Sequence, residues 1–232
     1  MYILKNENVG CDWYCKAAKL GNVDAQFYLG KQYINGRGVP KDAEIACDWF
    51  RKAAQQKHVN ATGYLGWYIE ISQHDYKGAS NCYKNALMLS RKGWLLCNLG
   101  RLYISGRGVD KDISQAIALF EEAAAQGDLT AIIRLYFIYS TGYEIKKDIN
   151  QSNIWQELFT LYFRDDSSII PSLVSDAIDA RDKLTQVCLG HLYENGNNCG
   201  IKVNTVQAKQ WYERAAAQQD SYAISRLLSL VE

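Results

Sequence analysis

The sequence has almost no net charge and no long apolar run. Lysine and arginine total 26 against 25 acidic residues, a formal charge of +1, so no long-range field draws in nucleic acid or an anionic membrane. No apolar stretch is long enough to span a bilayer, and the three-residue apolar run before Lys5 is too short for the core of a secretion signal. We expect a cytoplasmic protein, or a periplasmic one if an upstream signal was removed, with no nucleic-acid partner and no membrane insertion.

The sequence is also poor in residues that carry chemistry. Its three histidines, His58, His74 and His191, lie far apart, and none has a second histidine or a cysteine at ligand spacing. Two Gly-x-Gly loops follow no strand and lack the rest of a phosphate-binding fingerprint, and no P-loop lysine or nucleophile elbow is present. We therefore expect no catalytic residues, no cofactor and no metal, and hence a protein that is not an enzyme.

Disulfide bonds are not expected either. The chain has an odd number of cysteines without paired local spacing, which is poor support for a disulfide framework. We expect most of them to be small buried apolar residues. The seven are Cys11, Cys15, Cys47, Cys82, Cys97, Cys188 and Cys199.

What the chain does contain is a repeated unit, clearest at residues 99–127. Each copy begins with a helical pattern A-x-x-x-L-G-x-x-Y, which places its apolar residues on one stripe. The leucine recurs every 34 to 38 residues except once, a period typical of helical-hairpin solenoids. These leucines are Leu29, Leu65, Leu99, Leu135, Leu189 and Leu227.

A second helix follows in each copy, with bulky residues trailed by alanines, as in Trp49-Phe50 before Ala53-Ala54. We expect these rings to face the small residues of the first helix, which permits close approach of the two helices. The connecting loop recurs as 36–42, 106–112 and 142–148, with a glycine suited to a left-handed cap and a closing aspartate suited to cap the next helix. The copy at 72–78 lacks the glycines, so that hairpin should be shorter or bent.

The one irregular step falls between Leu135 and Leu189. An Asp and Ser run at 164–168 precedes Pro171, and we expect an amphipathic helix to begin at Ser172 and to run into the next first helix. The predicted organisation is a single solenoid over 1–232: a partial repeat 1–20, repeats 23–58, 59–92, 93–127 and 129–163, an insert 164–183, a repeat 184–219 and a closing helix 221–232.

These repeats resemble the Sel-one-like family, which is related to tetratricopeptide repeats. The resemblance rests on Leu29-Gly30-x-x-Tyr33, the loop 36–42, Ala46, Trp49-Phe50 and Ala53-Ala54, repeated at 99–127 and more loosely at 189–217. It implies an all-α, right-handed α-solenoid of about five to six stacked antiparallel hairpins. It further implies a scaffold or adaptor that binds another protein through a peptide, loop or helix, as in signalling, quality control, or bacterial immunity proteins that neutralise a toxin or effector.

In tetratricopeptide-type stacks the first helices line the concave face, so the positions that the core motif leaves free should meet the partner. Trp67 and Phe137 would act as anchors, and Lys31 and Arg101 would select an acidic ligand. The alternative is that the two aromatics pack between neighbouring first helices. The candidate partner-binding residues are Phe27, Lys31, Ile34, Trp67, Glu70, Arg101, Ile104, Ile133, Phe137, His191 and Glu194.

One alternative function and one question about the N-terminal end remain open. An enzyme with a cryptic site in the groove would use His191, Glu194 and Arg101, although no motif specifies a nucleophile, metal or cofactor. Separately, Trp13 and Tyr14 begin the chain without a first helix to cover them. We expect either missing upstream residues or self-association through this uncapped end.

The cysteine pattern gives a direct prediction. Because no disulfide framework is expected, titration with a thiol reagent in denaturant should count all seven cysteines as free. A count of one free thiol would contradict this expectation.

Overall fold

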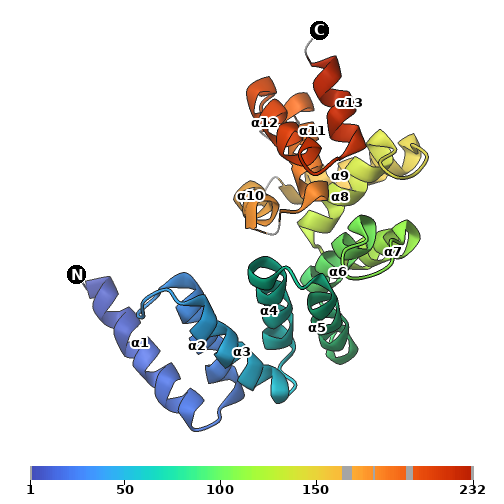
Figure 1. Cartoon of the computed structure of the whole chain (residues 1–232). Helices are drawn as coiled ribbons and strands as arrows, with labels where there is room; N and C mark the ends of the chain where they lie inside the picture. Colours follow the sequence, from blue (N-terminus) through green and yellow to red (C-terminus); the bar gives the residue numbers. More distant parts are fainter. Residues whose placement is uncertain (1, 164–168, 180, 197–200, 231–232) are drawn as a thin grey trace. The chain divides into compact units, whose positions relative to one another are not determined.

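A computed structural model describes residues 2–163, 169–179, 181–196 and 201–230. Regular structure in these residues is helical, and the two helices of each hairpin lie side by side (Figure 1). The chain divides into two compact units, Met1–Arg91 (unit 1) and Lys92–Glu232 (unit 2). Each unit is described by itself.

Unit 1 is a stack of helical hairpins in which each helix contacts the next. The apolar stripe predicted for each helix faces its neighbour, so that Ala46, Phe50 and Ala53 are fully buried. Its elements are α1 (Tyr2–Lys19), α2 (Val23–Asn35), α3 (Ala43–Gln55), α4 (Val59–Tyr68), the π-helical turn η1 (Ile69–Gln73) and α5 (Tyr76–Leu89).

Unit 2 adds a further kind of contact to the same hairpins. Besides the neighbours within each hairpin, its first helices α6, α8 and α11 contact one another. Its elements are α6 (Gly93–Ser105), α7 (Ile113–Ala124), α8 (Leu129–Thr141), α9 (Ile149–Phe163), α10 (Ile169–Asp179), α11 (Lys183–Asn195), α12 (Thr205–Ala216) and α13 (Ser221–Ser229).

In the hairpins of Gly30, Gly100 and Gly190, the glycine of the first helix receives an aromatic ring from the second, as predicted. A Cβ built on Gly30 would lie 2.6 Å from Cε1 of Phe50, and one built on Gly190 would lie 2.5 Å from Cε1 of Tyr212. Real Cβ atoms do not approach other atoms so closely, so even a methyl group would separate the helices. The ring fills the space that glycine leaves, which sets the distance between the helices of a hairpin.

The loops also form the predicted caps. Gly36 and Gly106 both lie in the left-handed region at φ 66°, where glycine has no Cβ penalty. Asp42 accepts a hydrogen bond from Ile45 N at 2.9 Å, and its own backbone N donates to Tyr33 O at 3.0 Å. The same pair of bonds recurs at Asp112, so the loop geometry repeats with the sequence.

The hairpin without loop glycines is shortened, as expected. Helix α4 passes into the π-helical turn η1, and only His74 and Asp75 separate that turn from α5. His74 takes the left-handed conformation at φ 54° in place of a glycine. Glu70, within the π-turn, is buried and accepts a hydrogen bond from the Tyr83 hydroxyl at 3.1 Å.

The irregular segment differs from its prediction. The helix expected from Ser172 begins at Ile169, with Pro171 in its first turn, and ends at Asp179 instead of continuing into the next first helix. Arg181 has a φ of 46°, and Asp182 caps α11 by accepting from Thr185 N at 3.1 Å. A capping aspartate starts a new helix here, which the apolar periodicity alone did not reveal. Residues 164–168 lie outside the described residues.

A buried arginine joins the first helices of unit 2. Arg134 on α8 is 2% exposed. Its guanidinium donates to Cys97 Sγ of α6 at 2.8 Å and to Thr185 Oγ1 of α11 at 2.8 Å, and it pairs with Asp182 at 3.2 Å. A buried cation is tolerated because it is paired and hydrogen-bonded in this way.

A second arginine links loops that are distant in sequence. Arg107, in the loop between α6 and α7, donates from Nη2 to Gln218 Oε1 at 2.8 Å and from Nη1 to the carbonyl of Arg181 at 3.4 Å. Gln218 lies between α12 and α13. This contact therefore joins two loops that α7 to α12 separate in the sequence.

Several features bear on the function classes considered above. Cys11, Cys15, Cys47, Cys82, Cys97 and Cys188 are free thiols, and Cys199 lies outside the described residues. Among the residues with described positions, no three metal-ligating side chains of histidine, cysteine, aspartate or glutamate gather in one place. No helix in the same residues combines the length and apolarity that a membrane crossing needs.

The close helix contact predicts a clear effect of Gly30→Ala. Overpacking against Phe50 outweighs the gain in helix propensity, so the free energy of unfolding should fall by about 1–2 kcal/mol. Gly10→Ala is the matched control, since a Cβ at Gly10 meets nothing within 4 Å. Urea denaturation of the full chain compares the two variants, and equal stability of both would contradict this account of the helix spacing.

Candidate functional site

Six of the eleven side chains expected on the concave face are buried. None of the six is more than 5% exposed, so the expectation that they meet a partner directly is corrected. They are Phe27, Glu70, Arg101, Ile104, Ile133 and Phe137.

In unit 2 these side chains are buried where the first helices pack on one another, whereas Phe27 in unit 1 is buried among aromatic rings of α3 and α4. The ring of Phe137 lies 5.3 Å from the rings of both Tyr143 and Tyr222. In unit 1, Phe27 lies 5.9 Å from Phe50 and 4.7 Å from His58. For Phe137 the packing alternative is therefore the correct one, and Arg101 is not available to select an acidic ligand.

Three of the remaining residues lie in unit 1, where two of them share a half-buried patch. The Lys31 amine of α2 lies 5.9 Å from the ring of Tyr64 on α4, and that ring lies 6.5 Å from the ring of Trp67. We name Lys31, Tyr64 and Trp67 the α2–α4 patch. Ile34 is half-buried against the adjacent core. The patch presents one cation beside two aromatic rings.

The other two, His191 and Glu194, lie together in a pocket of unit 2, which we name the α8–α11–α13 pocket. Its volume is ≈ 310 Å³. The C-terminal ends of α8 and α11, the loop after α8 and the helix α13 line it, so it is formed by first helices of successive hairpins. The lining residues are Ser140, Thr141, Lys147, His191, Glu194, Asn195, Tyr222 and Arg226.

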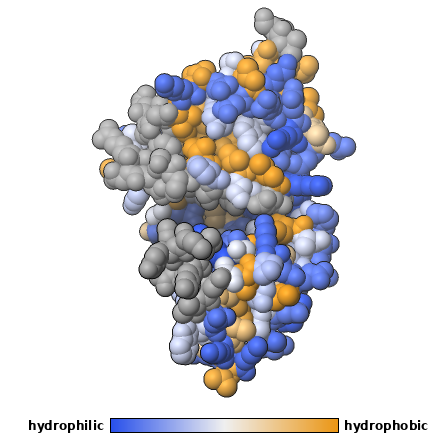
Figure 2. Space-filling view, turned by 90° about the vertical axis from the view of Figure 1, so that its left-hand side faces the viewer, coloured by the Kyte–Doolittle hydropathy of each residue, from blue (hydrophilic) through white to orange (hydrophobic). Residues whose placement is uncertain are grey.

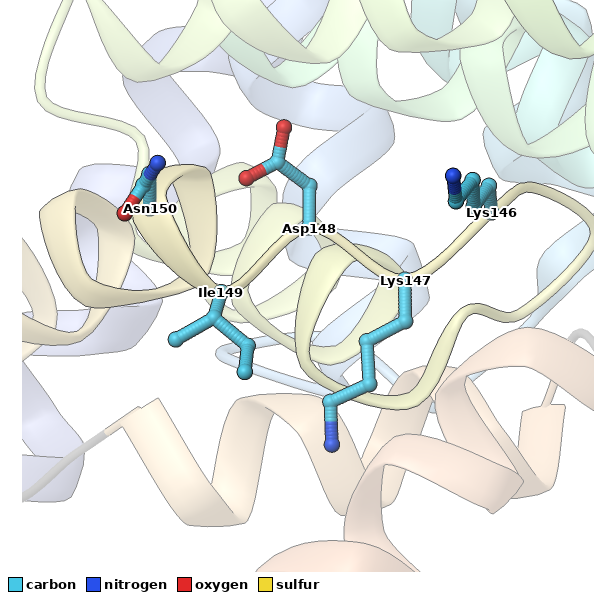
Figure 3. Close-up of a pocket in the computed structure, with 5 residues that line it drawn as sticks. All are labelled: Lys146, Lys147, Asp148, Ile149 and Asn150. Atoms are coloured by element: carbon cyan, nitrogen blue, oxygen red, sulfur yellow. The ribbon is translucent and has the colours of Figure 1, made fainter.

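A second hollow adjoins the same loop. It has a volume of ≈ 460 Å³ and is lined by residues 146–150. Figure 3 shows that Lys147 and Ile149 extend to one side of the chain, whereas Asp148 extends to the other. Lys147 lines both hollows.

The acid of the pocket is fully engaged. Glu194 forms a short ion pair with Arg226 of α13 and accepts a hydrogen bond from Tyr212 at 2.8 Å. Burial alone would raise the pKa of Glu194, but hydrogen bonds from Arg226 and Tyr212 outweigh it, so this pKa lies below its ordinary value. Glu194 and Arg226 therefore carry opposite charges that cancel within the pocket.

His191 is the neutral base of the pocket. Desolvation by burial lowers its pKa from 6.5 to about 4. The Asn195 amide nitrogen lies 3.2 Å from Nδ1 of His191 and can only donate, so Nδ1 is the acceptor and Nε2 carries the proton. The Tyr222 hydroxyl also lies 3.4 Å from Nδ1. At neutral pH the imidazole is thus an uncharged hydrogen-bond donor at Nε2.

The three side chains that the enzyme hypothesis combines do not come together. The enzyme reading requires His191, Glu194 and Arg101 together, but Arg101 is buried and does not line the pocket. Glu194 is occupied by Arg226 and Tyr212. Among the described residues, neither Ser140 nor Thr141 of the lining forms a hydrogen bond with His191, which bonds to Asn195 and Tyr222 instead. The pairing of a nucleophile with a base, as in a hydrolase, is not formed there.

Of the eight lining residues, the eleven candidates included His191 and Glu194. The six that they did not include are Ser140, Thr141, Lys147, Asn195, Tyr222 and Arg226. Lys147 belongs to a loop that was interpreted only as a cap. Asn195 is the last residue of α11 and directly follows Glu194, so including one more residue of this helix among the candidates would have found it. Tyr222 and Arg226 lie on the closing helix α13, whose weak copy of the motif gave no reason to place it at a site.

The model of the Sel1 repeat matches residues 1–22, 23–58, 96–128 and 187–220. The chain belongs to the Sel1 repeat family. The all-α fold of stacked helical hairpins is therefore confirmed, and Sel1 repeat proteins bind other proteins. The segments between the matched ranges contain the hairpin with the π-turn and the irregular segment before α11.

Solved Sel1 repeat structures share the fold. A Sel1 repeat protein from Oxalobacter formigenes is 27% identical, with a TM-score of 0.63 over 90% of this chain and 76% of that one. The protective antigen c5321 of uropathogenic Escherichia coli is 26% identical, with a TM-score of 0.59 over 95% of this chain and 44% of that one.

A curated relative is the chitin synthase regulator SKT5 of Saccharomyces cerevisiae. It is 30% identical over 134 residues, which is 56% of this chain and 16% of the yeast protein. The chain thus matches a small part of that protein.

The neutral His191 predicts a stability change with pH. Between pH 6.5 and about 4 the unfolded chain takes up a proton at this histidine and the folded chain does not, so stability falls as the pH is lowered through that window. In urea denaturation across the window, His191→Gln should show a shallower loss than the unmodified chain. Equal slopes would indicate that His191 titrates normally.

Proposed function

We propose that the chain is a non-enzymatic scaffold that binds a partner protein through the accessible parts of its first helices. These parts are the α8–α11–α13 pocket in unit 2 and the α2–α4 patch in unit 1. The observation that carries the proposal is that the ends of α8 and α11 and the helix α13 line one pocket, which the amine of Lys147 and the imidazole of His191 also line.

Two properties support this role. The pocket is open to solvent and combines the aromatic ring of Tyr222 with charged and amide groups, which suits a side chain or chain end of another protein better than a flat contact. On the face seen in Figure 2, hydrophobic residues form small groups between hydrophilic ones. Ile224 and Leu228 on α13 are 44% and 70% exposed and extend the surface that a partner can cover.

Three versions of this proposal differ in the identity of the partner. The name of the yeast relative describes a regulator of an enzyme, which supports a protein partner without specifying it. Neutralisation of a toxin or secreted effector is a second version, suggested by the family resemblance alone, and a cytoplasmic signalling or quality-control adaptor is a third. The gene neighbourhood and the proteins captured with the chain distinguish these versions.

The proposal predicts a loss of binding when the pocket is filled. Asn195→Arg places a long side chain at the rim and should weaken capture of the native partner about tenfold or more, a loss typical of a blocked anchor site. Gln210→Arg on the outer helix α12 is the control, because it adds the same charge at an exposed position away from the pocket. Capture from the source cells, quantified by mass spectrometry, measures both.

The unit 1 patch is tested separately with Trp67→Ala, which removes its largest ring. Capture should weaken while the melting temperature of the folded chain falls only slightly, because Trp67 is half-buried. If Asn195→Arg and Trp67→Ala both capture the same proteins at unchanged levels, the first-helix surfaces are not the binding site.

A further inference from the structure

We propose that the α8–α11–α13 pocket binds a carboxylate of the partner, held by Lys147 and the Nε2–H group of His191. This inference rests on the proposed function and specifies its chemistry. The carboxylate is an aspartate or glutamate side chain or the C-terminus of the partner chain.

The pocket contains one charged side chain, Lys147, that is not paired with an opposite charge in the described residues. Glu194 is neutralised by Arg226. Asp148 accepts from Gln151 N at 3.1 Å as the cap of α9 and points away from Lys147 in Figure 3. Lys147 lines the pocket and has no ion-pair partner among the residues that the structure describes. The pocket therefore keeps one positive charge that nothing in its lining compensates.

The acids on adjoining elements are occupied as well. Asp220, before α13, accepts hydrogen bonds from the Tyr143 hydroxyl at 2.7 Å and from Ala223 N at 2.9 Å, and its Oδ2 lies 3.8 Å from Lys183 Nζ. Glu144 pairs with Lys111 at 2.9 Å. No acid of the loop or of α13 is thus left to move onto Lys147 without breaking another contact.

The imidazole of His191 adds a hydrogen-bond donor to this pocket. Nδ1 of His191 is used as an acceptor, so its Nε2–H group is a donor, and no described residue accepts from it. A lysine ammonium and an uncharged N–H together match the two oxygens of a carboxylate. An incoming amine would instead meet the positive charge of Lys147 and would find Nδ1 of His191 already occupied as an acceptor.

The C-terminal ends of α8 and α11 repel an anion less strongly than unbonded carbonyl groups would, because several of their last carbonyl groups accept hydrogen bonds. At the end of α8, Phe137 O accepts from Thr141 Oγ1 at 2.6 Å, and Ile138 O accepts from Gly142 N at 3.0 Å. At the end of α11, Leu192 O accepts from Gly196 N at 2.8 Å. These bonds satisfy the carbonyls that otherwise make a helix C-terminus negative.

The test uses small probes and nuclear magnetic resonance of the full chain. N-acetyl-aspartic acid α-amide represents a side-chain carboxylate, and N-acetyl-glycylglycine represents a chain end. The neutral controls are the corresponding asparagine and amide compounds at matched ionic strength. Both carboxylates, or one of them, should shift the resonances of Lys147 and of the His191 ring saturably, whereas the amides should not. The arm that responds identifies the source.

Lys147→Gln should raise the dissociation constant of the responding carboxylate about fivefold, the factor expected for a partly exposed ion pair. Lys209→Gln removes the same charge from the exposed face of α12 and should leave the constant unchanged. Binding should also raise the pKa of His191, since a nearby anion favours its charged form.

The inference is overturned if amides and carboxylates shift these resonances equally, if neither shifts them, or if the two lysine variants bind alike. If one of these results is found and Asn195→Arg still loses capture of the partner, the proposed function stands and only carboxylate recognition is rejected. Unchanged capture by Asn195→Arg with carboxylate binding intact removes the pocket from the partner interface instead.

Discussion

The fit of an aromatic ring onto a glycine is the contact on which the rest of the structure depends. In the hairpins of Gly30, Gly100 and Gly190, a ring of the second helix occupies the place of a Cβ on the first. This contact sets the helix spacing within a hairpin and leaves the other side of the first helix to meet the next hairpin. The loops, with their repeated caps, then bring the chain back in the same register.

Close stacking also determines where a partner can bind. In unit 2 the first helices α6, α8 and α11 contact each other and surround Arg134, so the middle of their inner face belongs to the core. Accessible groups lie at the ends of α8 and α11, where the loop after α8 and the helix α13 contribute further side chains. The binding surface is thus placed by packing as much as by the repeat motif.

The repeat pattern predicted the hairpins, their caps and the ring-on-glycine contact because these depend on local spacing. It predicted less well which first-helix residues are exposed. Ile133 and Phe137 occupy positions that would face a groove in an open stack, and their burial depends on how closely neighbouring hairpins approach. His191 and Glu194 lie in the pocket, but Lys147 and Arg226 come from a loop and from the weakest repeat. Single-sequence periodicity carries little information on contacts between such distant segments.

The contact from Arg107 to Gln218 changes how unit 2 is expected to lose its structure. In a linear array of repeats each hairpin contacts only its neighbours, and the ends fray independently of the middle. Here the loop after α6 is tied to the loop before α13, although α7 to α12 separate them in the sequence. Such a hydrogen bond contributes about 1 kcal/mol, so separation of the last hairpin has to break a contact with the first one. We expect amide hydrogens beside these two loops to exchange several times more slowly than they would in an open array of repeats.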